Sequence, residues 1–138
     1  MNPVHFQYHD LSQFPLVFSR HAQAAKGYAE QWIREMEMLT TSEVPYVMVV
    51  LELDAEIDHE DRKQMVRWQT DNMSRLRQKC RGFVAVQPDP QALIRVSKQA
   101  EKMSRAFEVP FVVAPDAAGA REAALRLLRG VALGTTPR

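Results

Sequence analysis

Apolar runs alternate with amphipathic stretches along most of the chain. Short continuous runs at 46–51, 83–86 and 111–114 are rich in valine and phenylalanine, which is typical of buried strands. Around them, apolar residues recur at steps of three and four, which predicts helices over 60–79 and from Pro90 to Phe107. Strands alternating with helices of this length predict a mostly parallel sheet with helices on both faces.

The two ends of the chain extend this pattern. A helical face over 23–39 predicts a further helix, and the alternation of Val4, Phe6 and Tyr8 with polar residues predicts a half-buried edge strand, antiparallel to the apolar run 14–18. After Pro115-Asp116, a small-residue face predicts a last helix, formed by Ala120, Ala123, Ala124, Leu127 and Leu128. The predicted fold is a single-domain α/β three-layer αβα sandwich of four to five strands over 1–130, with a flexible tail at 131–138.

The helices of the second half carry end signals and an inward face. Gly82 is expected to end the helix over 60–79, while Asp89 is expected to cap the next helix, with Pro90 at its first position. The inward face of the earlier helix is expected to contain Met65, Val66, Met73, Leu76 and Cys80. That of the later helix is expected to contain Leu93, Val96, Ala100, Met103 and Phe107.

Charge is divided unevenly along a chain whose totals are ordinary. The 138 residues are 46% hydrophobic and 25% charged, as in a soluble globular domain, and the formal net charge is +1. However, residues 1–61 hold 11 acids and 3 bases, whereas residues 62–138 hold 6 acids and 15 bases. Such asymmetry concerns association with partners rather than the fold.

Several classes of protein are disfavoured. The single cysteine, Cys80, cannot form an intrachain disulfide, and no apolar run is long enough to cross a bilayer, so a cytoplasmic protein is expected. Bases next to Cys80 would lower the pKa of its thiol, although its inward position favours a buried, inert thiol. The glycines form neither GxGxxG nor a P-loop, and no cofactor is expected.

An acidic segment, residues 52–61, follows the predicted central strand and includes Asp54, Asp58, His59 and Glu60. Ligands of open α/β sheets bind at such strand ends, and carboxylates suit a hard cation, so one hypothesis is a metal-dependent enzyme that uses this segment. The alternative is that these acids precede and cap a helix, where negative charge is favoured.

The remaining polar residues offer little chemistry. His5 and His9 are interpreted as ordinary surface histidines, with zinc binding as the minority interpretation. Ser19 and His21 are not expected to share a face, and no GxSxG motif surrounds the serine, so no catalytic residue is assigned.

A basic ridge is predicted on the helix that starts at Pro90. Arg95, Lys98, Lys102 and Arg105 fall in one stripe opposite the apolar face. The near-neutral total charge and the lack of interleaved aromatic residues argue against nucleic acid as the partner. The ridge and the acidic segment favour docking on a protein or on another copy of the chain, with Trp68 as a candidate partly exposed anchor. The alternatives are that the ridge is only a solvated helix face and that Trp68 is a half-buried residue at the edge of the core.

Three strand sequences together resemble those of STAS-type domains. They are Pro-Leu-Val-Phe, Val-Met-Val-Val-Leu-Glu-Leu-Asp and Val-Pro-Phe-Val-Val, in a resemblance that spans about residues 4 to 128. The resemblance implies a small αβα regulatory module that binds partners and is in some cases controlled by a serine at the start of the helix after the central strand. Here that position reads Ile-Asp-His-Glu-Asp, so the serine is absent and Asp58 becomes a candidate permanent negative group.

Overall fold

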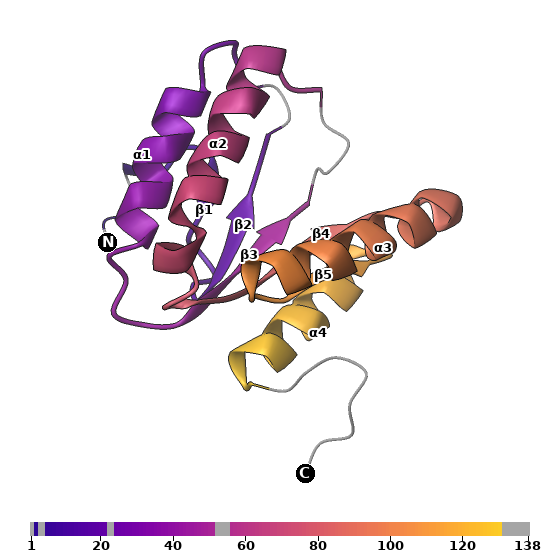
Figure 1. The fold of residues 1–138 in the computed structure, drawn as a ribbon. Helices are drawn as coiled ribbons and strands as arrows, with labels where there is room; N and C mark the ends of the chain where they lie inside the picture. Colours follow the sequence, from indigo (N-terminus) through magenta and orange to yellow (C-terminus); the bar gives the residue numbers. More distant parts are fainter. Residues whose placement is uncertain (1, 3–4, 22–23, 52–55, 131–138) are drawn as a thin grey trace.

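A five-stranded sheet and four helices form the fold (Figure 1). The computed structural model describes residues 2, 5–21, 24–51 and 56–130. The strands are β1 (His9–Asp10), β2 (Leu16–Ser19), β3 (Tyr46–Val50), β4 (Cys80–Val86) and β5 (Phe111–Ala114). The helices are α1 (Ala29–Leu39), α2 (His59–Leu76), α3 (Pro90–Phe107) and α4 (Ala117–Leu128). The predicted α/β class and its mostly parallel sheet are confirmed.

The strands lie in the sheet in the same order as in the chain. Strands β2 to β5 are parallel, and β1 pairs antiparallel with β2. Because each right-handed crossover moves the chain one strand in the same direction, the three connecting helices fall on one face. Helix α4, which follows the last strand, covers the other face, and the result is the expected three layers (Figure 1).

Two apolar clusters fill the spaces between these layers. Alternate residues of the strands point to opposite faces, so β3 supplies both clusters. The larger cluster lies under α1 and α2 and has the aromatic side chains Tyr28, Trp32, Tyr46, Trp68 and Phe83. The smaller cluster joins the sheet to α4 through Val47, Val49, Val84, Ala120 and Ala124. The small residues predicted for the last helix therefore pack on the sheet as expected.

The edge strand and the first helix differ from their predicted bounds. The antiparallel edge strand exists, but it is His9–Asp10, while Phe6 and Tyr8 precede it and Val4 lies outside the described residues. Helix α1 begins at Ala29 rather than at 23. The buried carboxylate of Asp61 accepts hydrogen bonds from the backbone amides of Gly27 and Ala29, which fixes a turn where the apolar pattern alone would continue the helix.

Gly82 lies inside β4 and does not end α2, whose last residue is Leu76. A Cβ atom at Gly82 would lie 2.7 Å from Cδ1 of Leu127 and 3.1 Å from the carbonyl oxygen of Pro110. Glycine therefore suits a position that the backbone at Pro110 and the side chain of Leu127 both approach closely. Its reason is a tertiary contact, not the end of a helix.

The inward faces predicted for α2 and α3 are only partly buried. Helices α1 and α2 pack along each other, whereas α2 and α3 are barely in contact. As a result Val66 of α2 is 54% exposed and Met103 of α3 is 41% exposed, although both were predicted to point inward. Of the five predicted inward residues of α3, Ala100 alone is fully buried. In the described part of the chain, no helix is both long and apolar enough to span a bilayer.

Candidate functional site

Helix α3 carries the basic ridge, and its ends are fixed by local sequence. The side chain of Asp89 accepts a hydrogen bond from the amide of Ala92, and Pro90 occupies the first turn, as predicted. Glu108 ends the helix in a left-handed conformation with φ 56°. The 18-residue helix is about 27 Å long at 1.5 Å per residue. It therefore presents a long straight surface to solvent.

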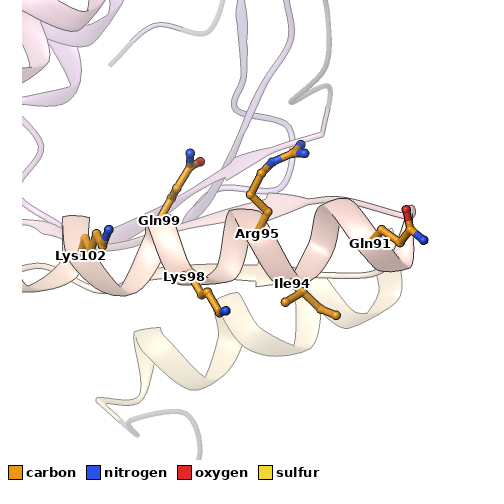
Figure 2. A pocket seen from close by; sticks show the side chains of 6 residues that line it. All are labelled: Gln91, Ile94, Arg95, Lys98, Gln99 and Lys102. Atoms are coloured by element: carbon orange, nitrogen blue, oxygen red, sulfur yellow. The ribbon is translucent and has the colours of Figure 1, made fainter.

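All four residues of the basic ridge are exposed on α3. Three of them, Arg95, Lys98 and Lys102, line an open depression of about 490 Å³ together with Gln91, Ile94 and Gln99 (Figure 2). Arg95 and Gln99 point to one side of the helix, and Ile94 and Lys98 point to the other (Figure 2). The side chain of Ile94 is 63% exposed. Positive charge and apolar surface therefore occur together on this face.

The basic ridge has no acidic partner within the described residues. None of Arg95, Lys98, Lys102 and Arg105 forms an ion pair there, although Glu101 lies on the same helix. Elsewhere in the described chain, by contrast, Arg75 bridges α2 to Glu37 of α1 at 2.9 Å. The charge of the basic ridge therefore faces solvent without compensation from the fold.

The acidic segment serves the fold rather than a ligand site, as far as it is described. Asp54 lies outside the described residues. Asp58 caps α2 by accepting hydrogen bonds from the amides of Glu60 and Asp61, as the capping interpretation predicted. Asp61 is 2% exposed and binds the turn before α1. His59 and Glu60 remain exposed on the first turn of α2.

The described residues contain no group of three or more histidine, cysteine, aspartate or glutamate side chains placed to hold a metal ion. Cys80 is 1% exposed, and burial raises the pKa of its thiol to about 12. A thiol with this pKa is protonated at neutral pH and is a poor nucleophile. The interpretation of Cys80 as a buried, inert thiol agrees with this environment.

Trp68 is not a surface anchor. Its side chain is 9% exposed, and its indole Nε1–H donates a hydrogen bond to Oε1 of Glu37 at 2.9 Å. The ring meets that of Trp32 edge to face with centroids 6.2 Å apart. The prediction of a partly exposed interface residue is therefore wrong, because α1 covers the indole and provides an acceptor for its N–H.

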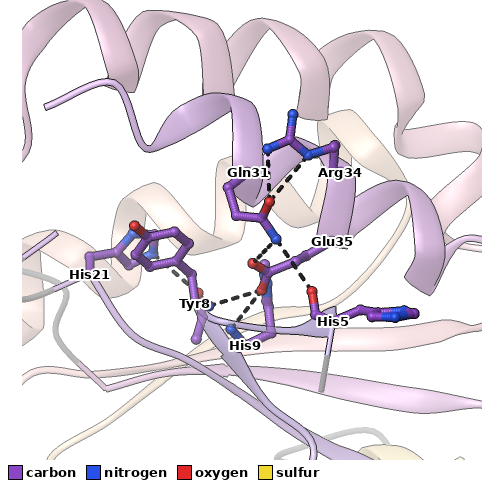
Figure 3. Close-up of polar contacts among 8 residues, drawn as sticks. His5, Tyr8, His9, His21, Gln31, Arg34 and Glu35 are labelled. Carbon is purple, nitrogen blue, oxygen red and sulfur yellow. Dashed lines mark hydrogen bonds and ion pairs between the residues drawn. The ribbon is translucent and has the colours of Figure 1, made fainter. Parts of the chain in front are cut away.

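A buried polar cluster under α1 was not predicted from the sequence (Figure 3). Glu35 is fully buried, and its Oε1 atom lies 2.9 Å from Nδ1 of His9. The same oxygen accepts hydrogen bonds from the amides of Tyr8 and His9, and Oε2 accepts one from Gln31. His9 is therefore a core residue, not a surface histidine, and β1 is held in place by a carboxylate.

The donors around Glu35 determine its ionisation. Burial alone would raise its pKa, but hydrogen bonds from His9, Gln31 and the backbone outweigh burial and hold the pKa below its usual value. Because the carboxylate is ionised, Nδ1 of His9 must carry the donated hydrogen. A sequence signal did exist: Glu35 lies between Trp32 and Met36 on the apolar face of its helix, where a lone carboxylate requires buried donors.

Ser19 and His21 lie together, contrary to the sequence expectation. Ser19 Oγ is 3.1 Å from Nε2 of His21, and Nδ1 of His21 is 2.8 Å from the hydroxyl of Tyr28. The two side chains meet because residues two apart point to the same side of an extended chain. Ser19 is only 1% exposed and Tyr28 5%, so among the described residues this chain of hydrogen bonds joins β2 to the start of α1 inside the core.

No protein-family model, curated protein or solved structure matches the chain. The functional assignment therefore rests on the chain's own surface, where the face of α3 combines exposed apolar atoms with uncompensated charge.

Proposed function

We propose that this chain is a non-enzymatic regulatory or scaffolding module of STAS-like fold that acts by binding a partner protein through the exposed side of α3. The observation that carries the proposal is the basic ridge, which lies beside the 63% exposed Ile94 and has no acidic partner within the described chain. Complementary charge orients and accelerates docking, and exposed apolar side chains supply the contact area.

A comparison with α2 supports this choice of surface. Helix α2 has the same length of 18 residues and carries Lys63 and Arg67 four residues apart on its exposed side. Acids at Glu60 and Asp71 flank this pair at spacings of three and four, which neutralises the surface locally. On α3 the corresponding pair is Lys98 and Lys102, with Glu101 three residues from Lys98 and four from Arg105. Helix α3 has this one acid for its four bases, whereas α2 has three acids for its four bases. The positive field is therefore concentrated on α3.

Self-association is the second form of this proposal, with the acidic first half of one copy against the basic ridge of another. Of the described acids in the first half, Glu35 and Asp61 are buried and Glu37 is paired with Arg75, which leaves Glu43, Glu56 and Glu60 exposed for such a contact. We also propose a cytoplasmic location, since the single cysteine cannot form an intrachain disulfide.

Quantitative affinity purification from the native host tests the proposal. Lys98→Glu/Lys102→Glu should lose the partner that the wild type recovers, by about tenfold or more. Lys63→Glu/Arg67→Glu is the matched control, because it makes the same change in net charge on an exposed helix of the same length, and it should retain the partner.

Equal recovery by both double variants, or recovery of nothing by the wild type at physiological salt, would remove the proposal. Light scattering after size-exclusion chromatography at low and high salt separates the two forms. A dimer that dissociates as salt rises would replace the heterologous partner with a second copy.

A further inference from the structure

An apolar groove of about 470 Å³ runs between α2 and α3 over the sheet. Its floor is formed by side chains that point to the same face of the sheet, namely Val50, Phe83, Ala85, Phe111 and Val113. The rings of Phe83 and Phe111 are stacked against each other with centroids 4.8 Å apart at the base of the groove, where Phe83 is buried and Phe111 is half-buried. Val96, Ala100 and Met103 of α3 form one wall, and Gln69 of α2 lies on the other.

The described part of the chain leaves this groove open, because α2 and α3 do not pack along each other. Adjacent helices on a sheet normally pack about 10 Å apart, which buries the strand residues between them. Here Val113 and Ala85 of the floor remain half-buried, and Met103 is 41% exposed on the wall. Contiguous apolar surface of this kind is typical of binding sites.

The charge around the groove indicates the chemistry of its occupant. Arg95 lines both the groove and the depression over the basic ridge, so the two features are continuous. Lys98 and Lys102 extend the positive charge along the same helix, and the described residues that line the groove include no acid. An occupant with carboxylates beside its apolar side chains would meet both surfaces at once.

The floor also indicates the backbone conformation of the occupant. The backbone groups of β3, β4 and β5 are paired with each other in the sheet, and an occupant that lies on the face of the sheet gains no main-chain hydrogen bonds from them. At the open edge of β5, the hydroxyl of Ser104 already binds both the amide and the carbonyl oxygen of Phe111. A helix satisfies its own backbone groups and suits this groove better than an added strand does.

We propose that the groove binds an acidic amphipathic helix of the partner protein, an inference that rests on the function proposed above. The wall runs from Arg95 to Met103, eight residues along α3, which is about 12 Å at 1.5 Å per residue. About two turns of the bound helix therefore contact the floor, with aliphatic or aromatic anchors at positions i, i+3 or i+4, and i+7. Its acidic residues face Arg95, Lys98 and Lys102.

A library of random 16-residue peptides displayed on phage provides the probe. The library is selected on the wild-type chain after depletion on Gln99→Trp, a variant that fills the groove from an exposed position on its wall. The surviving peptides should carry apolar residues at the stated spacing and a net negative charge. The best peptide, labelled with fluorescein, should bind Gln99→Trp at least about tenfold more weakly than wild type.

Gln64→Trp is the matched control, because it makes the same substitution at an exposed position of α2 outside the groove, and it should leave peptide affinity unchanged. Peptide affinity should also fall as salt rises. The proposal is overturned if no peptide survives depletion, if the survivors are basic or uncharged, or if both tryptophan variants bind equally. A wild-type dimer that Gln99→Trp dissociates would also overturn it, by placing a second copy in the groove.

The groove and the proposed function can fail separately. If Gln99→Trp keeps the cellular partner while Lys98→Glu/Lys102→Glu loses it, docking through α3 stands and the helix in the groove is wrong. If neither variant changes recovery of the partner, the proposed function itself fails.

Discussion

Helices α1 and α3 both have a clear apolar face, but only α1 is covered. Trp32, Met36 and Leu39 of the 11-residue helix α1 are 0–3% exposed, whereas the 18-residue helix α3 has one fully buried residue, Ala100. Helix α1 packs between α2 and β1, while α3 has the sheet on one side and the open groove on the other. An apolar pattern therefore predicts a helix but not how completely the rest of the chain buries it.

The polar residues of the two regions differ in the same way. Under α1, a buried carboxylate has a donor for each oxygen, and Arg75 of α2 is paired with Glu37. On α3, four bases face solvent, and none of them forms an ion pair within the described residues. The α1 region resembles a completed core, and the α3 region resembles one half of an interface. Variants that act on stability should therefore cluster under α1, and variants that act on binding should cluster on α3.

The largest loss of stability is expected for Glu35→Ala. The substitution leaves Nδ1 of His9 and the amides of Tyr8 and His9 buried without an acceptor, which should cost about 3–5 kcal/mol of unfolding free energy in urea denaturation. Glu35→Gln keeps an acceptor oxygen and should lose less. A cost below about 1 kcal/mol for Glu35→Ala would mean that the cluster does not support the fold.

Two methionines provide the direct test of unequal burial. Met36→Ala empties a fully buried site under α1 and should cost about 2–5 kcal/mol. Met103→Ala, on the groove wall of α3, should cost less than about 1 kcal/mol because 41% of that residue is already exposed. Urea denaturation measures both values. Equal costs would show that α3 is as well packed as α1.

Acid should destabilise the α1 region through Glu35. Its pKa is lower in the folded chain than in the unfolded one, so the folded state is favoured above the unfolded value of about 4.3. This stabilisation of the folded state is lost as the pH falls below about 4.3 and then passes the pKa of Glu35 in the folded chain. In thermal unfolding between pH 7 and pH 3, Glu35→Gln should therefore show a shallower decline than wild type. Parallel curves would contradict the assigned shift.

The smallest effect on stability is expected on α3 itself. Lys98→Glu/Lys102→Glu removes no ion pair within the described chain and should change the unfolding free energy by no more than about 0.5 kcal/mol per substitution. Thermal unfolding at low salt is the measurement. A larger loss would show that the basic ridge interacts with another part of the chain. The ridge would then not be a free docking surface.

Local signals predicted most of the fold, and tertiary contacts account for the errors. The cap at Asp89 and the run Phe111–Ala114 required only neighbouring residues, and both are found as predicted. The start of α1 depended on Asp61, more than 30 residues away, and the role of Gly82 depended on Leu127. Neither relation leaves a periodic signal in the sequence.

The candidate site shows the same limit. The four bases of the ridge could be predicted from spacing alone, because one helix defines their common face. The groove beside them depends on how far α2 lies from α3, and the burial of Trp68 depends on α1. His9 and Ser19 are paired across strands β1 and β2. The alternation of residues 4–8 predicts a strand, but it does not say which residue of the neighbouring strand lies opposite each position.

Site-specific photocrosslinking in the native host tests the central claim most directly. A benzophenone amino acid is placed at Lys98 on α3 and, in a second variant, at Lys63 on α2, both exposed positions on helices of equal length. We expect a discrete crosslinked protein from position 98 that disappears when Arg95→Glu is added, and none from position 63. Crosslinking from position 63 alone, or from neither position, would contradict it.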